Sequence, residues 1–170
     1  MEGERARGGM WRAEVTVGEW FVPEENRLAQ ASACEGTARV LQATRRGGAW
    51  AGLGHSVAAF ETALSYARQR IQFGRALAAS QVVQERLARM LFEVTTLQAL
   101  LMRLALPEER GELSGPQSSL GKYTATRTAR RVVADARDLL GGNGFLVGNR
   151  VARHFADVEA LHSYEGIETS

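Results

Sequence analysis

The sequence predicts an all-α fold, a bundle of long helices with a short β segment at its N-terminus. From about Glu35 onward, apolar residues recur every three or four positions through three long stretches, which is typical of amphipathic helices. The connections between these stretches are short, as in antiparallel bundles. Only three prolines occur in the 170 residues, and a hydrophobic content of 45% is sufficient for one substantial core.

The composition excludes several classes of protein. A formal net charge of +2 is too small for a strongly basic nucleic-acid surface. The single cysteine, Cys34, excludes an intrachain disulfide and is consistent with a reducing compartment. No apolar run approaches the roughly 20 residues of a membrane span, and the N-terminus lacks a signal-peptide core. We therefore expect a soluble, cytoplasmic protein that binds neither nucleic acid nor membrane.

The N-terminal residues are expected to stand apart from the helices. Residues 1–11 are charged and glycine-rich, which favours a poorly ordered tail. Residues 12–22 alternate around Val15 and Val17, which predicts one or two short strands. A lone hairpin is marginal in water, so this segment resembles the edge of a sheet whose other strands are absent. We therefore expect two units, residues 1–34 and a helical domain of residues 35–170.

The first predicted helix runs from about Glu35 to a stop at Phe73 and Gly74. Four glycines lie within it, and since each costs up to about 1 kcal/mol relative to alanine, they indicate close backbone packing. They are Gly47, Gly48, Gly52 and Gly54. The apolar stripe of this helix consists of Leu53, Val57, Phe60, Leu64, Ala67 and Ile71.

Three further helices are predicted. The second begins at Ser80 as its N-cap and ends at Pro107. The third spans residues 117–140, where frequent alanine and threonine predict close helix packing, and a short fourth helix spans residues 148–155. The apolar face of the second helix consists of Leu87, Met90, Leu91, Val94, Leu97, Leu101 and Leu104.

Two groups of polar residues have ordinary interpretations. A rough basic stripe on the third helix resembles a phosphate-binding face, but solvated arginines on a helix surface are far commoner. This stripe consists of Arg127, Arg130, Arg131 and Arg137. The three histidines, His55, His154 and His162, lack the spacing of metal ligands, so no metal site is expected.

A glycine-rich break follows the third helix. Gly141, Gly142 and Gly144 remove Cβ atoms where the backbone turns sharply or approaches another group, and Asn143 tolerates left-handed geometry. The break is therefore a helix C-cap, a backbone surface for a ligand, or both. Further on, a lone glutamate, Glu165, lies in a segment rich in groups that could line a pocket.

Three motifs in this order resemble the C-terminal part of the acyl-CoA dehydrogenases. They are YARQRIQFGRALAASQVVQERLARM from Tyr66, ARDLLGGNGF from Ala136, and YEG from Tyr164. The resemblance extends from about Glu14 to the last residue and is strongest to the glutaryl-CoA dehydrogenase branch, which favours RxQFG, ARDxLGGNG and EAxxxYEG. A single GGNG would be a weak signal, whereas three motifs at compatible separations are a strong one.

The resemblance implies a three-part flavoenzyme, with a helical domain, a middle β domain and a C-terminal four-helix bundle. FAD would lie between domains and between subunits, commonly in a tetramer. The chain matches the end of the β domain and most of the bundle, with the last helix truncated. We therefore expect a fragment, the product of a broken reading frame, or a pared-down relative.

The resemblance also assigns roles to individual residues. Glu165 matches the base that removes the α-proton of an acyl-CoA thioester, although a lone glutamate is usually an exposed loop residue. Arg70, Gln72 and Phe73 match contacts to the FAD pyrophosphate and adenine side, or otherwise form a helix stop. Five further residues match the family's second FAD-contacting stretch, and the alternative is that they only form a glycine helix stop. They are Asp138, Leu139, Leu140, Gly141 and Gly142.

Two hypotheses about function follow. Arg45 and Tyr164 match substrate-contacting positions, which supports α,β-dehydrogenation of an acyl-CoA, with glutaryl-CoA as one candidate. Ile167 stands where the family usually has threonine, which weakens the expected FAD contact there. The alternative is a non-catalytic helical module that self-associates or binds a partner supplying the other domains.

Overall fold

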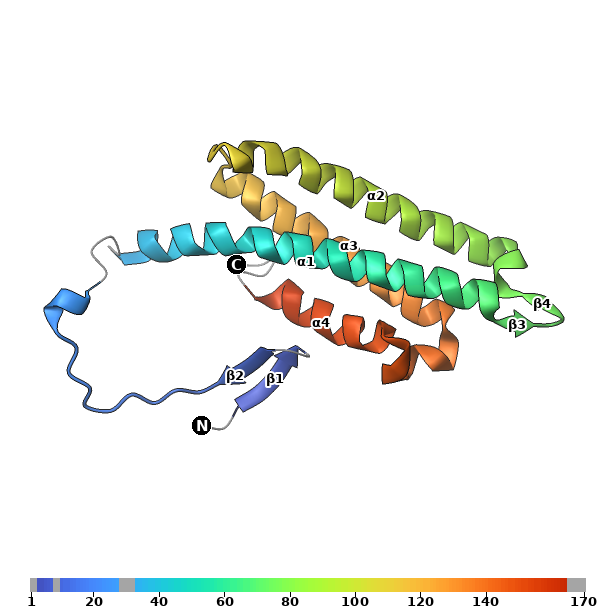
Figure 1. The fold of residues 1–170 in the computed structure, drawn as a ribbon, viewed down its shortest axis with the longest axis horizontal. Coiled ribbons are helices and arrows are strands. Elements are labelled where there is room, and N and C mark those ends of the chain that lie inside the picture. The colour runs from blue at the N-terminus through green and yellow to red at the C-terminus, as the bar shows by residue number, and fades with distance from the viewer. Residues whose placement is uncertain (1–2, 8–9, 28–32, 165–170) are drawn as a thin grey trace.

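The structure is a computed structural model that describes residues 3–7, 10–27 and 33–164. Its architecture is helical, as the sequence predicts (Figure 1). Helix α1 runs the length of the bundle, with α2 along one side of it and α4 along another. The four α-helices are α1 (Ala33–Gln69), α2 (Gln81–Glu109), α3 (Gly115–Leu139) and α4 (Val151–Ser163).

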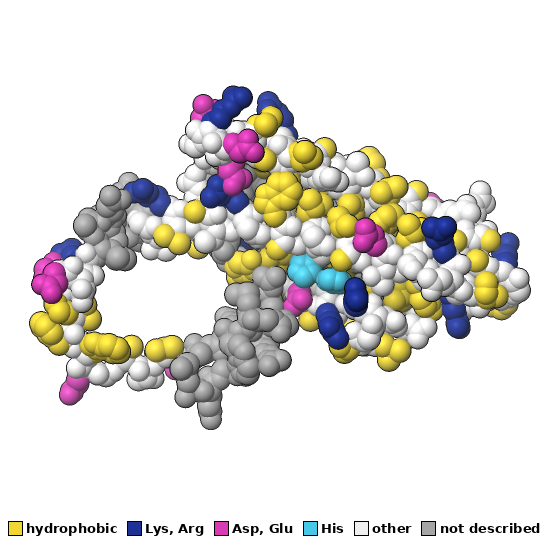
Figure 2. Space-filling model, in the orientation of Figure 1, with side chains coloured by type: hydrophobic (Ala, Val, Ile, Leu, Met, Phe, Trp, Pro, Cys, Tyr) yellow, Lys and Arg dark blue, Asp and Glu magenta, His cyan; other side chains and the backbone are white. Residues whose placement is uncertain are grey.

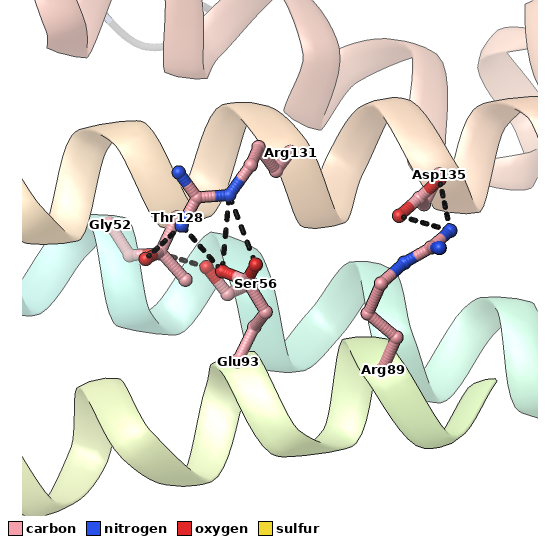
Figure 3. A network of polar contacts seen from close by, with 7 residues as sticks. All are labelled: Gly52, Ser56, Arg89, Glu93, Thr128, Arg131 and Asp135. Carbon is pink, nitrogen blue, oxygen red and sulfur yellow. Dashed lines mark hydrogen bonds and ion pairs between the residues drawn. The ribbon is translucent and has the colours of Figure 1, made fainter. Parts of the chain in front are cut away.

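Helices α1 and α3 pack most extensively against each other, through small side chains. A Cβ added at Gly52 would lie 3.1 Å from the backbone oxygen of Ala125, tighter than most Cβ contacts, so the two helices approach closely there. The prediction of close packing is therefore confirmed at Gly52, whereas Gly47 and Gly54 face open space. Nearby, the buried hydroxyl of Ser56 donates to the Gly52 carbonyl oxygen at 2.8 Å (Figure 3).

Helix α2 buries most of the apolar face predicted for it. Leu91 is the exception, because it is 49% exposed. The predicted end at Pro107 is also wrong, since α2 continues to Glu109. Pro107 lies two residues before the end of α2, where little helix remains to be disrupted, and its carbonyl accepts from the Glu112 N–H at 2.8 Å. The residues buried along α2 are Leu87, Met90, Val94, Leu97 and Leu101.

By length and composition alone, α2 could also cross a membrane, with a mean hydropathy of 1.3 over 18 residues. From the sequence we expected no apolar run long enough for a membrane span, so this finding differs from that expectation. One such helix is a weak indication, because the core helices of soluble bundles pass the same test. Here α2 packs against α1 and α3.

Helix α3 begins with a capping box, two residues before the predicted start. The Ser114 hydroxyl oxygen accepts from the Gln117 backbone N–H, while the Gln117 side chain accepts from the Ser114 N–H at 2.9 Å. Pro116 lies in the first turn, where its lack of an N–H costs little. The predicted close packing is confirmed, since Ala125, Ala129 and several neighbouring threonines are buried.

The N-terminal strands lie elsewhere than predicted. An antiparallel hairpin of β1 (Gly3–Arg7) and β2 (Met10–Ala13) occupies the segment expected to be a poorly ordered tail. The alternating segment around Val15 and Val17 forms no strand, and both side chains are exposed. Alternation alone cannot form a strand there, because no strand in the described ranges pairs with that segment. A short 3-10 helix, η1 (Glu24–Asn26), then precedes α1.

Helix α4 begins later and extends further than residues 148–155. Two 3-10 turns, η3 (Gly141–Phe145) and η4 (Val147–Asn149), lie between α3 and α4. The glycines and the positive φ of Arg150 delay the helix until Val151. From there, α4 buries Val151, Val158 and Leu161 against the rest of the bundle.

Candidate functional site

An open cleft of about 430 Å³ lies at the end of the bundle where α1 finishes and α2 begins. It gathers residues from the ends of α1 and α3, the start of α2 and the turn η3, segments that are far apart in the sequence. Its volume is within the usual range of small-molecule sites. The lining consists of Tyr66, Arg70, Gln72, Leu77, Val82, Val83, Arg86, Asp138, Leu139, Leu140, Gly141, Gly142 and Asn143.

The first motif forms a miniature hairpin at this cleft. Strand β3 (Ile71–Gln72) pairs with β4 (Arg75–Ala76), followed by a 3-10 turn, η2 (Leu77–Ala79). Phe73 and Gly74 have φ values of 51° and 77°, the sign that a type I′ hairpin turn requires. The predicted helix stop at this pair is therefore wrong, because α1 already ends at Gln69.

The hairpin also separates the predicted cofactor residues of this motif. Arg70 and Gln72 line the cleft. Phe73 is 101% exposed at the hairpin tip and lies outside the lining. Ile71, predicted to continue the apolar stripe of the first helix, is 60% exposed in β3.

The glycine break serves both as a helix end and as a wall of the cleft. Gly141 follows the C-cap residue Leu140 and has a φ of 57°, a conformation that favours glycine. Gly142 presents open backbone to the cleft, since a Cβ there would meet nothing within 4 Å. At Gly144 a Cβ would lie 2.3 Å from the carbonyl oxygen of Arg137, so only glycine allows the chain to fold back on α3.

A hydrogen bond between α1 and the glycine break shapes the cleft. The Asn143 side-chain amide donates to the Tyr66 hydroxyl at 2.8 Å, and the Asn149 amide donates to the Asn143 carbonyl at 2.8 Å. No sequence motif predicts these contacts of Tyr66 and Asn143. One signal was available: Tyr66 lies four residues before Arg70, and the Arg70 backbone N–H donates to the Tyr66 carbonyl oxygen at 2.8 Å, which keeps the two residues close.

The other predicted residues lie at the opposite end of the bundle. Arg45 donates to the Ser119 hydroxyl at 2.9 Å, and it lies about 32 Å along α1 from the cleft residue Tyr66, at 1.5 Å per residue. On α3 near Ser119, the almost fully buried Lys122 ammonium donates to the His162 carbonyl at 3.0 Å. A cation at the last carbonyls of a helix is favourable, so Lys122 fixes the end of α4, where Tyr164 is the C-cap. Glu165 and Ile167 lie outside the described residues.

Comparisons with known proteins decide the family. Residues 35–169 match the acyl-CoA dehydrogenase C-terminal domain. The chain belongs to the acyl-CoA dehydrogenase family. It is 34% identical over 128 residues to a 3-(aryl)acrylate reductase of Clostridium sporogenes, covering 75% of this chain and 34% of that protein.

Solved structures of the family share the fold. A glutaryl-CoA dehydrogenase from Mycobacterium smegmatis superposes with a TM-score of 0.83 and 34% identity, covering 86% of this chain and 38% of that one. A glutaryl-CoA dehydrogenase from the same organism, in complex with FADH2, superposes with a TM-score of 0.78 and 29% identity. The match covers 81% of this chain and 36% of that one. The chain thus spans about a third of the length of these acyl-CoA dehydrogenase relatives.

The cleft of this acyl-CoA dehydrogenase domain fits one side of an FAD molecule. Arg70 and Arg86 offer guanidinium groups for a diphosphate, and the open backbone at Gly142 allows a flat group to approach. Leu77, Val82 and Val83 add apolar surface. The cleft is open rather than enclosed, so it would cover the cofactor from one side.

Two histidines join α1 to α4, a proximity that their sequence positions do not indicate. The Nδ1 atoms of His55 and His154 lie 2.8 Å apart, with the rings in a T-shaped arrangement. Burial lowers the pKa of His154 below its ordinary value of 6.5, nearby Asp157 partly opposes this, and Arg150 adds to the lowering. Among the described residues, no three potential metal ligands come together.

We expect this pair to make the domain less stable in mild acid. Below the ordinary pKa of histidine, the unfolded chain takes up a proton that folded His154 resists, so the free energy of unfolding decreases as the pH falls from about 6.5. Above that pH the contribution is constant. Urea unfolding at several pH values should show a shallower decrease for His154→Gln than for the parent. Parallel curves would contradict the assignment.

Proposed function

We propose that this chain is the C-terminal part of an FAD-dependent acyl-CoA dehydrogenase that oxidises an acyl-CoA thioester between its α and β carbons. One observation carries the proposal. The two segments that resemble FAD contacts, at Arg70 and at residues 138–142, meet in one cleft although they are far apart in the sequence. Glutaryl-CoA is one candidate substrate, because this branch carries the same three motifs.

The proposed chemistry divides between the cofactor and the chain. Bound FAD supplies the acceptor for the β-hydride. Glu165 would accept the α-proton, since burial against an apolar substrate can raise a carboxyl pKa toward the working pH. Lys122 and Arg45 would position this region without touching the reacting atoms. Lys122 holds the end of α4 through the His162 carbonyl, and Arg45 contacts Ser119 on α3.

The distance between the two ends of the bundle favours an assembly of several chains. The cleft residue Tyr66 and Arg45 lie about 32 Å apart along α1, so a single chain cannot bring both ends to one reacting centre. A neighbouring copy that contributes its cleft would complete the FAD site of the first. The exposed Phe73 at the hairpin tip is suited to such a contact, because it projects away from its own domain.

Helix α2 carries a surface suited to self-association. On the side facing away from the bundle, six exposed residues follow the 4-3 spacing of a coiled-coil seam, and none is charged. Yellow side chains gather along this edge of the molecule (Figure 2). We call this surface the outer stripe; it consists of Ala88, Phe92, Thr95, Ala99, Met102 and Leu106.

The outer stripe matches itself when two copies are antiparallel. With a two-fold axis at its centre, Phe92 would face Met102, and the small Ala88 would face the larger Leu106. Small side chains, Thr95 and Ala99, lie at the middle, where the two helices would cross most closely. Phe92 is 70% exposed and Met102 is 59% exposed, so pairing would remove a large apolar area from water.

We expect the purified chain to self-associate at tens of micromolar in sedimentation experiments. Phe92→Glu should weaken association by at least about 10-fold, because it buries an unpaired charge. Thr96→Glu is the control, since Thr96 is exposed on the same helix outside the outer stripe. A clean monomer, or equal effects of the two changes, would contradict the interface.

We also expect the chain alone to retain little FAD through gel filtration, because the cleft covers only one side of the cofactor. Fusion to the N-terminal two-thirds of a glutaryl-CoA dehydrogenase should give a yellow protein. In the fusion, Arg70→Ala should lower the FAD content by removing a charge-assisted contact. Stoichiometric flavin on the chain alone would contradict the first expectation. A colourless fusion would favour the alternative, a non-catalytic module that associates through the outer stripe.

A further inference from the structure

Ion pairs hold α2 and α3 together in a regular series. Arg131 on α3 pairs with Glu93 on α2 at 2.6 Å, and Arg89 pairs with Asp135 at 3.4 Å (Figure 3). Because the two helices run in opposite directions, each step toward the start of α2 is matched by a step toward the end of α3. The same register places Arg86 opposite Asp138, one step nearer the cleft.

This third pair does not form. The Asp138 carboxylate pairs instead with its neighbour, Arg137. Among the described residues, the Arg86 side chain has no hydrogen bond, ion pair or ring contact. Its own helix offers no acidic residue one turn away in either direction, since those positions hold Val82, Val83, Arg89 and Met90.

The unpaired Arg86 lines the same cleft as Arg70, and it is partly buried. Two guanidinium groups that have no partner in the described part of the chain therefore face one space of about 430 Å³. Guanidinium groups bind phosphate oxygens through paired donors, and partial burial strengthens such contacts. The carboxylate of Asp138 would repel an anion, but its pairing with Arg137 offsets that repulsion.

We propose that Arg86 is a second diphosphate-binding residue, which receives the anion of a dinucleotide between the ends of α2 and α3 beside Arg70. The inference rests on the proposed function, because FAD is the dinucleotide that the cleft would hold. It assigns a role to a residue of α2 for which the resemblance implied none. The first turn of α2, at Val82 and Val83, lies at the same cleft and adds the favourable field of a helix N-terminus.

The test is an NMR titration of the 15N-labelled chain with ADP, which carries the diphosphate without the flavin. In the parent, ADP should cause saturable shifts around residues 70–72, 82–86 and 138–143. Arg86→Gln and Arg70→Gln should each raise the dissociation constant by about 5- to 10-fold, in line with loss of one charge-assisted contact. Arg110→Gln, at the far end of α2, is the matched control and should change it by less than about 2-fold.

Adenosine, which lacks phosphates, should bind at least about 10-fold more weakly than ADP. The Arg86 side-chain Nε–Hε signal, identified by its loss in Arg86→Gln, should shift when ADP is added to the parent; this readout does not depend on the stability of the variant. If only Arg70→Gln weakens binding and the Arg86 signal stays in place, the inference fails while the proposed function stands. If neither change matters, or if ADP does not bind, the cofactor cleft itself is refuted.

Discussion

Gly144→Ala should destabilise the domain by about 3 kcal/mol, a large effect for the addition of one methyl group. The added Cβ would lie 2.3 Å from the Arg137 carbonyl oxygen and 3.1 Å from its carbon. Both belong to the backbone of α3, so no side chain can rotate away to make room. Either the break would have to move away from α3 or the last turn of α3 would have to open.

Thermal unfolding provides the measurement. For a domain of this size, a loss of about 3 kcal/mol corresponds to a melting temperature lower by roughly 6–12 °C. Gly142→Ala is the matched control, since a Cβ there meets nothing within 4 Å, and it should change stability by less than about 0.5 kcal/mol. If the two variants melt together, the close approach of the break to α3 is not a feature of the folded protein.

The helices could be predicted from the sequence because their signals are local. The 3-4 spacing of Leu87, Met90 and Val94 places them on one face wherever the helix lies, and all three are buried. The ends of the helices were less predictable, because the same two residues can adopt more than one local structure. Phe73 and Gly74 can end a helix or form the turn of a hairpin, and the choice depends on whether Ile71 and Gln72 find partners for pairing.

The residues of the candidate site also divide into those that a local motif predicts and those that depend on long-range packing. Local motifs predicted Arg70 and Gly142 as site residues, and both line the cleft. No motif indicated the hydrogen bond from Asn143 to Tyr66, which joins residues 77 positions apart. The contact of Lys122 with the end of α4 was equally hidden, because its partner is a backbone carbonyl that any residue provides. Such contacts arise from the packing of whole helices and carry no signature of their own.

Glu165→Gln should abolish flavin reduction by acyl-CoA in a fusion that supplies the other domains. The amide keeps the shape of the side chain but cannot accept the α-proton, so the rate should fall by about 10⁴-fold, the upper range for loss of a general base. FAD content should stay near that of the parent, because the residues that resemble cofactor contacts are unchanged. Stopped-flow absorbance of the flavin measures the rate, and the absorbance of the purified protein measures the content.

Glu159→Gln is the matched control for Glu165→Gln, because Glu159 lies on α4 and pairs with Arg130 at the surface. It should reduce flavin within about 2-fold of the parent rate, since an exposed ion pair of this kind contributes little to stability. A loss confined to Glu165→Gln, with FAD retained, would distinguish a missing base from a misplaced α4. If Glu165→Gln reduces flavin at the parent rate, the base is another residue and the assignment of Glu165 is wrong.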